Sequence, residues 1–303
     1  MSERGKGVWC AVGAYLAWGL MPVYWKALRA VPAPLLLAHR VVWSCLFLAL
    51  LVLATRRLRS LVEALRRPHA LRSFSLAALL ISANWLIYVW AVNAGHIVET
   101  SLGYFINPLL NVALGALLLG ERLRPLQWAP LALAGGGVAW LAVSQGAPPW
   151  IALALALSFG LYGLVKKTSP LGAVAGLTME TVLLMPPALA LLLWLETQGQ
   201  GALGRLGAGR GLLLAAAGPI TAVPLLLFAA GARRIPLSLV GLLQYLAPSL
   251  QFLIGVAVYH EPFGARQLAG FGLVWTGLLL FAAESLWRTR RPPQPSAAEA
   301  ASL

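Results

Sequence analysis

The chain has 303 residues, of which 60% are hydrophobic and 11% are charged, and its net charge is +14. Soluble domains carry about 25% charged residues, so this chain has too few polar side chains to cover a globule in water. The composition excludes an ordinary soluble domain and predicts an all-α membrane protein, for which the lipid bilayer is the first partner.

The positive charge does not indicate nucleic-acid binding. Lys and Arg lie in short connectors between apolar runs, where they orient a membrane protein, and no basic stripe alternates with aromatic residues. The chain has no Asp, and Cys10 and Cys45 lie inside apolar segments without the spacing of a metal site. We therefore expect no nucleic-acid partner, no metal and no cofactor.

Ten apolar runs have the length of transmembrane helices, which need about 20 residues to cross a bilayer. The connectors are short except for 56–72 and 196–210, and the polar residues 288–303 are predicted to be a disordered cytoplasmic tail. The predicted helices are 7–28, 33–55, 73–93, 98–119, 125–143, 149–165, 170–195, 211–231, 236–259 and 265–287.

The Lys and Arg residues predict how these helices are oriented. With the N-terminus in the cytoplasm, 17 of the 23 positive residues fall on the cytoplasmic side, five fall on the other side, and Arg40 lies within a helix. Cytoplasmic loops of membrane proteins are enriched in Lys and Arg. The pattern predicts a multi-pass protein of the bacterial inner membrane with both termini in the cytoplasm.

The two halves of the sequence match each other at a nearly constant shift. Because each half holds five helices, the second half must enter the membrane from the opposite side. We therefore predict two inverted five-helix repeats, 1–145 and 146–287, an architecture typical of secondary transporters with a site near mid-membrane. The matched pairs are Pro108 with Pro248, Gly115 with Gly255, Glu121 with Glu261 and Gln127 with Gln267, 140 residues apart, and Trp9 with Trp150, Gly19 with Gly160 and Lys26 with Lys167, 141 apart.

Polar and small residues form equivalent stripes along the fourth and ninth predicted helices, each with a proline near its middle. A proline frees a backbone carbonyl, which is tolerated at that depth only inside protein or beside a cavity. The stripes predict a cavity lining, although the same groups could simply hold helices together. The stripes are Ser101, Tyr104, Pro108, Asn111 and Gly115, and Gly241, Gln244, Pro248, Gln251 and Gly255.

Two further helices supply candidate cavity residues, because a ligand pocket is mostly apolar or aromatic. Packing in the protein core is an equally good interpretation of these positions. They are Asn84, Trp85 and Tyr88 in the third helix, and Thr221, Pro224 and Phe228 in the eighth.

The predicted spans contain the ionisable residues His39, Arg40 and Glu180. Charges at this depth are costly, so such residues are functional candidates with an expected partner. Arg40 and Glu180 are equivalent at the 140-residue shift, and we expect them to face each other or a hydrated cavity. Alternatively, Arg40 extends to the outer surface. Glu99 opens the fourth helix, and its carboxylate is expected to cap the N-terminus of that helix.

Longer strings of residues follow in order along nearly the whole chain. They are Ala17-Trp18-Gly19-Leu20, Tyr24-Trp25-Lys26, His39-Arg40, Trp85-Leu86-Ile87-Tyr88, Ser101-Leu102-Gly103-Tyr104-Phe105-Ile106-Asn107-Pro108, Glu121-Arg122-Leu123, Arg233-Arg234 and Leu243-Gln244-Tyr245-Leu246-Ala247-Pro248. With these strings the chain resembles the RarD group of EamA-type transporters, in the drug/metabolite transporter superfamily. The resemblance implies ten helices, two EamA repeats, membrane transport, and a central cavity enclosed mainly by helices 3, 4, 8 and 9.

The sequence therefore predicts a secondary transporter that works by alternating access around a mid-membrane site. Amide and hydroxyl groups without fixed charge favour a small uncharged or zwitterionic substrate, either a polar or amphipathic metabolite or a drug. A membrane enzyme is disfavoured because there is no HExxH motif and no catalytic constellation. A non-transporting sensor or assembly factor is the remaining alternative. The expected site residues are Tyr104, Asn107, Asn111, Gln244 and Gln251.

Overall fold

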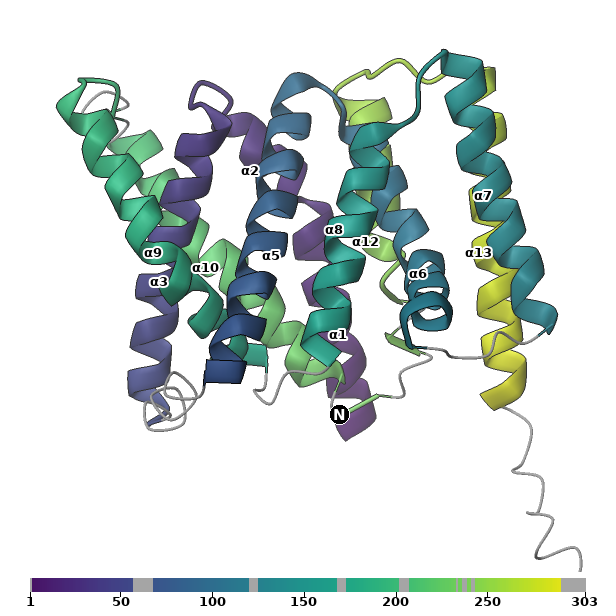
Figure 1. Ribbon diagram of the computed structural model, residues 1–303, viewed down its shortest axis with the longest axis horizontal. Coiled ribbons are helices and arrows are strands. Elements are labelled where there is room, and N and C mark those ends of the chain that lie inside the picture. The colour runs from purple at the N-terminus through teal and green to yellow at the C-terminus, as the bar shows by residue number, and fades with distance from the viewer. Residues whose placement is uncertain are drawn as a thin grey trace, which may run out of the picture.

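The computed structural model describes residues 2–56, 68–119, 125–167, 173–201, 207–232, 234–235, 239–240 and 243–289. Within these residues the secondary structure is helical, with no β-strand. The predicted tail beyond Thr289 and the repeat residue Glu121 lie outside the described part of the chain. The helices run roughly alongside one another, and the N-terminus and the C-terminal end of α13 lie at the same end of them (Figure 1).

The helix bounds follow the apolar runs of the sequence closely. Each helix ends where a proline, a glycine or a polar connector ends the apolar run. The helices are α1 (Glu3–Gly19), α2 (Met21–Ala27), α3 (Ala33–Ala54), α5 (Pro68–Ala94), α6 (Ile97–Leu119), α7 (Pro125–Gln145), α8 (Trp150–Lys167), α9 (Ala173–Thr197), α10 (Gly207–Ala232), α12 (Leu246–Leu253), η1 (Ile254–Val258) and α13 (Ala265–Thr289).

Much of the helix surface is apolar and exposed. In the described chain, seven helical segments are long and apolar enough to cross a membrane: α1 with α2, and parts or all of α3, α5, α7, α9, α10 and α13. Leu117 is 80% exposed and Val143 is 82% exposed, and Leu50, Leu212 and Leu279 are also largely uncovered. A water-soluble surface does not carry so much apolar area, so the protein is a multi-pass membrane protein.

The first predicted helix, 7–28, is two helices in the structure. Leu20 separates α1 from α2, and Pro22 occupies the first turn of α2. Proline has no N–H to donate to the carbonyl four residues earlier, which is that of Trp18. The break therefore leaves this carbonyl open to a side chain of another helix.

The ninth predicted helix, 236–259, also differs from a regular α-helix. Its described C-terminal part is α12 followed by η1, a stretch of π-helix in which the Tyr259 N–H donates to the Ile254 carbonyl at 3.0 Å. Single π-turns inside α-helices are rare, and many of those that occur lie at functional sites.

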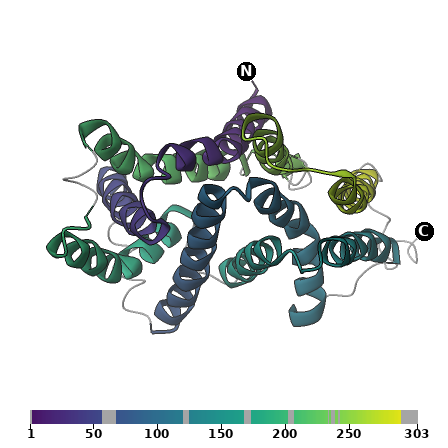
Figure 2. The same cartoon turned by 90° about the horizontal axis from the view of Figure 1, so that it is seen from above.

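The main pairs of packed helices recur when the two halves of the chain are exchanged. The packing of α1 on α10 has its counterpart in α8 on α5, and the packing of α1 on α12 has its counterpart in α8 on α6. Likewise, α3 packs on α10, and α9 packs on α5. The pairs α3–α9 and α7–α13 each join two equivalent helices, so exchanging the halves gives the same pair again. The α7–α13 pair lies at one end of the assembly and α3, α9 and α10 lie at the other (Figure 2).

Two equivalent glycines allow the close approach behind this pattern. A methyl group added at Gly19 of α1 would lie against Leu250 of α12, and one added at Gly160 of α8 would lie against Leu110 and Asn111 of α6. Leu110 and Leu250 are 140 residues apart, and Gly19 and Gly160 are 141 apart. The same contact between a small residue and a leucine therefore occurs once in each half.

Candidate functional site

A buried arginine lies where four helices meet. Arg40 of α3 is 7% exposed, and its Nε donates a hydrogen bond of 3.1 Å to Oγ1 of Thr221 on α10. Its guanidinium lies over the ring of Trp85 on α5, with the Cζ atom 3.8 Å from the ring centroid, and 5.3 Å from the ring of Trp25 on α2. A guanidinium held over aromatic faces is fixed in orientation and gains cation–π attraction. Arg40 thus does not extend to the outer surface.

Tyrosines complete the surroundings of Arg40. Tyr24, Tyr88 and Tyr104 lie near its guanidinium. The rings of Tyr88 and Tyr104 meet edge to face with centroids 5.8 Å apart, and the Tyr24 hydroxyl donates to the Leu213 carbonyl at 2.6 Å. We call Trp25, Arg40, Trp85, Tyr88, Tyr104 and Thr221 the Arg40 cluster.

The Arg40 cluster unites candidates that the sequence presented on separate helices. Arg40, Trp85, Tyr88, Tyr104 and Thr221 were each predicted site residues, and the structure brings them together. Trp25 was missed as a site residue, because it stood near the end of an apolar run and could be explained by the membrane interface. Its signal was the Tyr24-Trp25-Lys26 string.

Glu180 has a different environment from Arg40. It is fully buried on α9, and its Oε2 accepts a hydrogen bond of 3.0 Å from the Tyr162 hydroxyl on α8. In the described chain Arg40 bonds to Thr221, so the two repeat-equivalent residues hold different partners rather than each other. His39, next to Arg40, is 2% exposed, and its Nε2 is enclosed without a hydrogen-bond partner.

The amide of Gln251 compensates for the break in the first helix. Gln251 of α12 is 3% exposed, and its Nε2 donates a bond of 3.0 Å to the Trp18 carbonyl, the group that Pro22 leaves free. Its Oε1, like Oδ1 of Asn107 on α6, is enclosed without a donor. These groups lie on α6 and α12, which contact each other and carry the two predicted stripes.

The remaining members of the stripes are distributed between the interior and the surface. Pro248 is buried, Pro108, Gln244 and Tyr104 are half-buried, and Asn111 is exposed beside Gly160. Phe228 packs against the rings of Tyr15 and Trp18, with centroids 6.0 and 5.8 Å away. Their role in binding stays a prediction.

Two predicted cavity residues make hydrogen bonds that explain their burial. Asn84 of α5 donates from Nδ2 to the Leu155 carbonyl at 3.0 Å and to Oγ of Ser158 at 2.9 Å, which joins α5 to α8. The Ser101 hydroxyl donates to the Val98 carbonyl of its own helix at 2.6 Å. The packing interpretation accounts for both.

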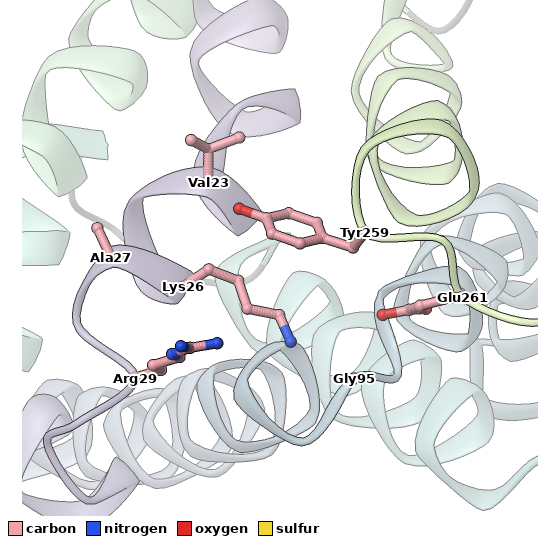
Figure 3. A pocket seen from close by; sticks show the side chains of 7 residues that line it. All are labelled: Val23, Lys26, Ala27, Arg29, Gly95, Tyr259 and Glu261. Carbon is pink, nitrogen blue, oxygen red and sulfur yellow. The ribbon is translucent and has the colours of Figure 1, made fainter.

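A cavity of about 500 Å³ lies at the end of the helices opposite to the N-terminus. It is lined by Val23, Lys26, Ala27, Arg29, Gly95, Tyr259 and Glu261 (Figure 3). The Lys26 ammonium lies 5.3 Å from the centroid of the Tyr259 ring. The sequence did not predict this cavity, although Lys26 and Arg29 were two of the few positive residues placed on the outer side.

The carboxylate of Glu261 binds the start of another helix at this end. Its Oε1 accepts from the Ile97 N–H and its Oε2 from the Val98 N–H, both at 2.8 Å, so it caps the N-terminus of α6. Glu99 does the same for a neighbour: its Oε1 accepts from the Ile151 N–H of α8 at 3.0 Å. Glu99 was expected to cap the N-terminus of its own helix, α6, and it instead caps the N-terminus of α8.

The opposite end of the molecule is held by charged residues. Glu3 pairs with Lys6 at 2.8 Å and with Arg234 at 3.1 Å, which links the start of α1 to the segment after α10. These side chains are 40 to 68% exposed. Contacts between separate parts of the chain therefore exist at both ends of the helices.

Comparison with known proteins identifies the family. The model of the EamA-like transporter family matches the chain twice, over residues 5–143 and 148–283. The chain belongs to the EamA-like transporter family. This EamA protein is 47% identical over 290 residues to Protein RarD of Streptomyces exfoliatus, covering 96% of this chain and 92% of that protein. It is 41% identical to Protein RarD of Escherichia coli (strain K12) and 46% identical to the uncharacterized transporter YojE of Bacillus subtilis (strain 168), over at least 92% of each chain.

A solved structure shares the fold of this EamA protein. A crystal structure 22% identical in sequence superposes with a TM-score of 0.59, covering 95% of this chain and all of the other. The family and the relatives make the protein a RarD-type EamA membrane transporter.

Proposed function

We propose that this protein is a secondary transporter that moves a small polar or amphipathic metabolite or drug across the bacterial plasma membrane by alternating access. The observation that carries the proposal is the set of helix contacts that survives exchange of the two halves. In transporters built from inverted repeats, the two halves adopt slightly different conformations, and exchanging them moves the opening from one side to the other.

Ten membrane spans in two inverted halves are part of this proposal. The seven long apolar helices, the shorter apolar helices Trp150–Val165 and Leu246–Val258, and α6 together supply ten crossings. An even number of crossings agrees with both ends of the described chain lying at one end of the helices (Figure 1). The positive charges favour the cytoplasm for that end.

The proposed substrate region lies among α2, α3, α5, α6, α10 and α12. The Arg40 cluster and the amides of Asn107 and Gln251 are among the polar groups buried there. The helix breaks at Leu20 and η1 supply points where segments can bend. Binding and translocation, rather than chemical conversion of the substrate, is the activity that these groups support, because they form no nucleophile–base pair.

The test is uptake by purified protein in liposomes. Liposomes containing the protein are incubated with an extract of cellular metabolites, with and without a pH gradient, and their contents are compared by mass spectrometry with those of protein-free liposomes. We expect a restricted set of solutes to accumulate or equilibrate faster through the protein.

Two variants make the test specific to the proposed site. Gln251→Leu should slow uptake strongly, whereas Gln198→Leu, at an exposed amide after α9, should leave it unchanged. If folded wild-type protein moved no solute faster than protein-free liposomes, a non-transporting sensor or assembly factor would replace the proposal. Equal uptake by the two variants would remove Gln251 from the site.

A further inference from the structure

Around Arg40 lie hydrogen-bond donors for which the described part of the chain supplies no acceptor. Trp25 is 1% exposed and Tyr88 is 5% exposed, and both the Nε1 of Trp25 and the hydroxyl of Tyr88 are enclosed without a partner. Arg40 donates through Nε to Thr221, and the described residues provide no acceptor for its two terminal nitrogens. Buried donors are paired in the great majority of cases, so two enclosed donors beside the terminal nitrogens of a guanidinium need a common explanation.

Within the described ranges, no carboxylate forms an ion pair with Arg40. Among the described residues, the ion pairs at hydrogen-bond distance are those of Glu3 with Lys6 and Arg234, at the far end of α1. Glu180 occupies the position equivalent to Arg40 in the other repeat, and its carboxylate accepts a hydrogen bond from the Tyr162 hydroxyl. A buried cation without an anion is costly in a membrane protein, and such residues mark binding sites for charged groups.

The geometry leaves one edge of the guanidinium available. The Trp85 ring lies against the face of the guanidinium, and Oγ1 of Thr221 accepts the hydrogen bond from Nε. The terminal N–H groups of a guanidinium form a fork that matches the two oxygens of a carboxylate. Aromatic rings of Trp25, Trp85, Tyr88 and Tyr104 surround that position with apolar surface.

We propose that Arg40, Tyr88 and Trp25 bind the carboxylate of a monoanionic or zwitterionic substrate, whose apolar body packs against Trp85 and Tyr104. This inference rests on the proposed transport function and narrows its substrate to molecules with a carboxylate. One guanidinium neutralises one negative charge, so a carboxylate fits better than a doubly charged phosphate. The cavity shown in Figure 3 is lined by Lys26, the neighbour of Trp25, and by Arg29. These two side chains provide positive potential on the way to the site.

Binding is measured without transport, so that this proposal and the transport proposal can fail separately. Purified protein in detergent micelles is titrated with acetate, benzoate and indole-3-carboxylate and with the corresponding neutral amides. The readouts are tryptophan fluorescence, to which Trp25 and Trp85 contribute, and the thermal unfolding midpoint. We expect at least one carboxylate to bind at least tenfold more tightly than its amide.

The variants separate ligand binding from folding. Tyr88→Phe removes one hydroxyl and keeps the ring against Tyr104, so it should weaken carboxylate binding about fivefold or more while the unfolding midpoint is unchanged or higher. Arg40→Gln should abolish the preference for carboxylate over amide. Tyr15→Phe, in a separate buried cluster with Ala11 and Ile235, is the matched control and should bind like the wild type.

Two results would overturn the proposal. One is that all three carboxylates bind no more tightly than their amides. The other is that Tyr88→Phe keeps full carboxylate affinity. If Arg40→Gln does not fold, these two comparisons still decide the matter. Carboxylate binding without any transport in liposomes would support this site and contradict the transport function.

Discussion

The bond between Glu261 and the start of α6 yields a prediction whose size can be worked out from the structure. Each carboxylate oxygen accepts one backbone N–H at 2.8 Å, from Ile97 and from Val98. In Glu261→Gln, one oxygen remains an acceptor, while the new NH₂ group faces the other N–H as a second donor. One hydrogen bond to a charged group, worth about 1.5–3 kcal/mol, is lost. The negative charge at the helix N-terminus, worth about 0.3–1 kcal/mol, is lost as well.

We therefore expect Glu261→Gln to lower the free energy of unfolding by about 2–4 kcal/mol. The assay is reversible unfolding of the protein in mixed micelles, followed by circular dichroism at increasing denaturant. Glu3→Gln is the matched control, because Glu3 is also paired but 68% exposed, and exposed pairs contribute at most about 1 kcal/mol. Equal destabilisation by the two substitutions would refute the reasoning that the Glu261 carboxylate holds the start of α6.

Three further substitutions test the packing of the helices. Gly218→Ala should destabilise the protein by about 1–3 kcal/mol, because its methyl group would meet the backbone of Trp43 on α3, whereas Gly272→Ala on α13 meets nothing and should be neutral or stabilising in the same unfolding assay. Asn84→Leu should lower the free energy of unfolding by about 1–2 kcal/mol through loss of two interhelical bonds, with unchanged carboxylate binding in the titration; a loss of binding with full stability would instead make Asn84 a ligand residue.

The positions of the helices could be predicted because hydrophobic length alone determines where a chain can cross a bilayer. The break at Leu20 was the main error along the chain. Pro22 lies in an apolar run of sufficient length, and a length criterion does not distinguish one continuous helix from two short ones. The π-turn at Ile254–Val258 has no sequence signal of its own, because it depends on how α12 packs on α6.

The candidate site could be predicted residue by residue but not as an arrangement. The cost of burying a charge made Arg40 a functional candidate, and the repeat suggested Glu180 as its partner, yet Arg40 bonds to Thr221 and lies over Trp85. Which side chains meet depends on the rotation of each helix about its own axis, and a polar stripe on one helix does not fix that rotation relative to the others. For the same reason the sequence identified Glu99 as a capping residue without indicating that it caps α8.

The central claim is that the two halves open the protein at one end while closing it at the other. In a protein with Cys10 and Cys45 replaced, cysteines at positions 26 and 259 lie across one end, and cysteines at 3 and 234 lie across the other. Each pair is joined with a short, reducible bis-thiol reagent, and uptake is measured in liposomes against the single-cysteine variants. The account predicts that linking either pair stops uptake and that reduction restores it. Uptake at the unlinked rate with either pair fully linked would contradict alternating access.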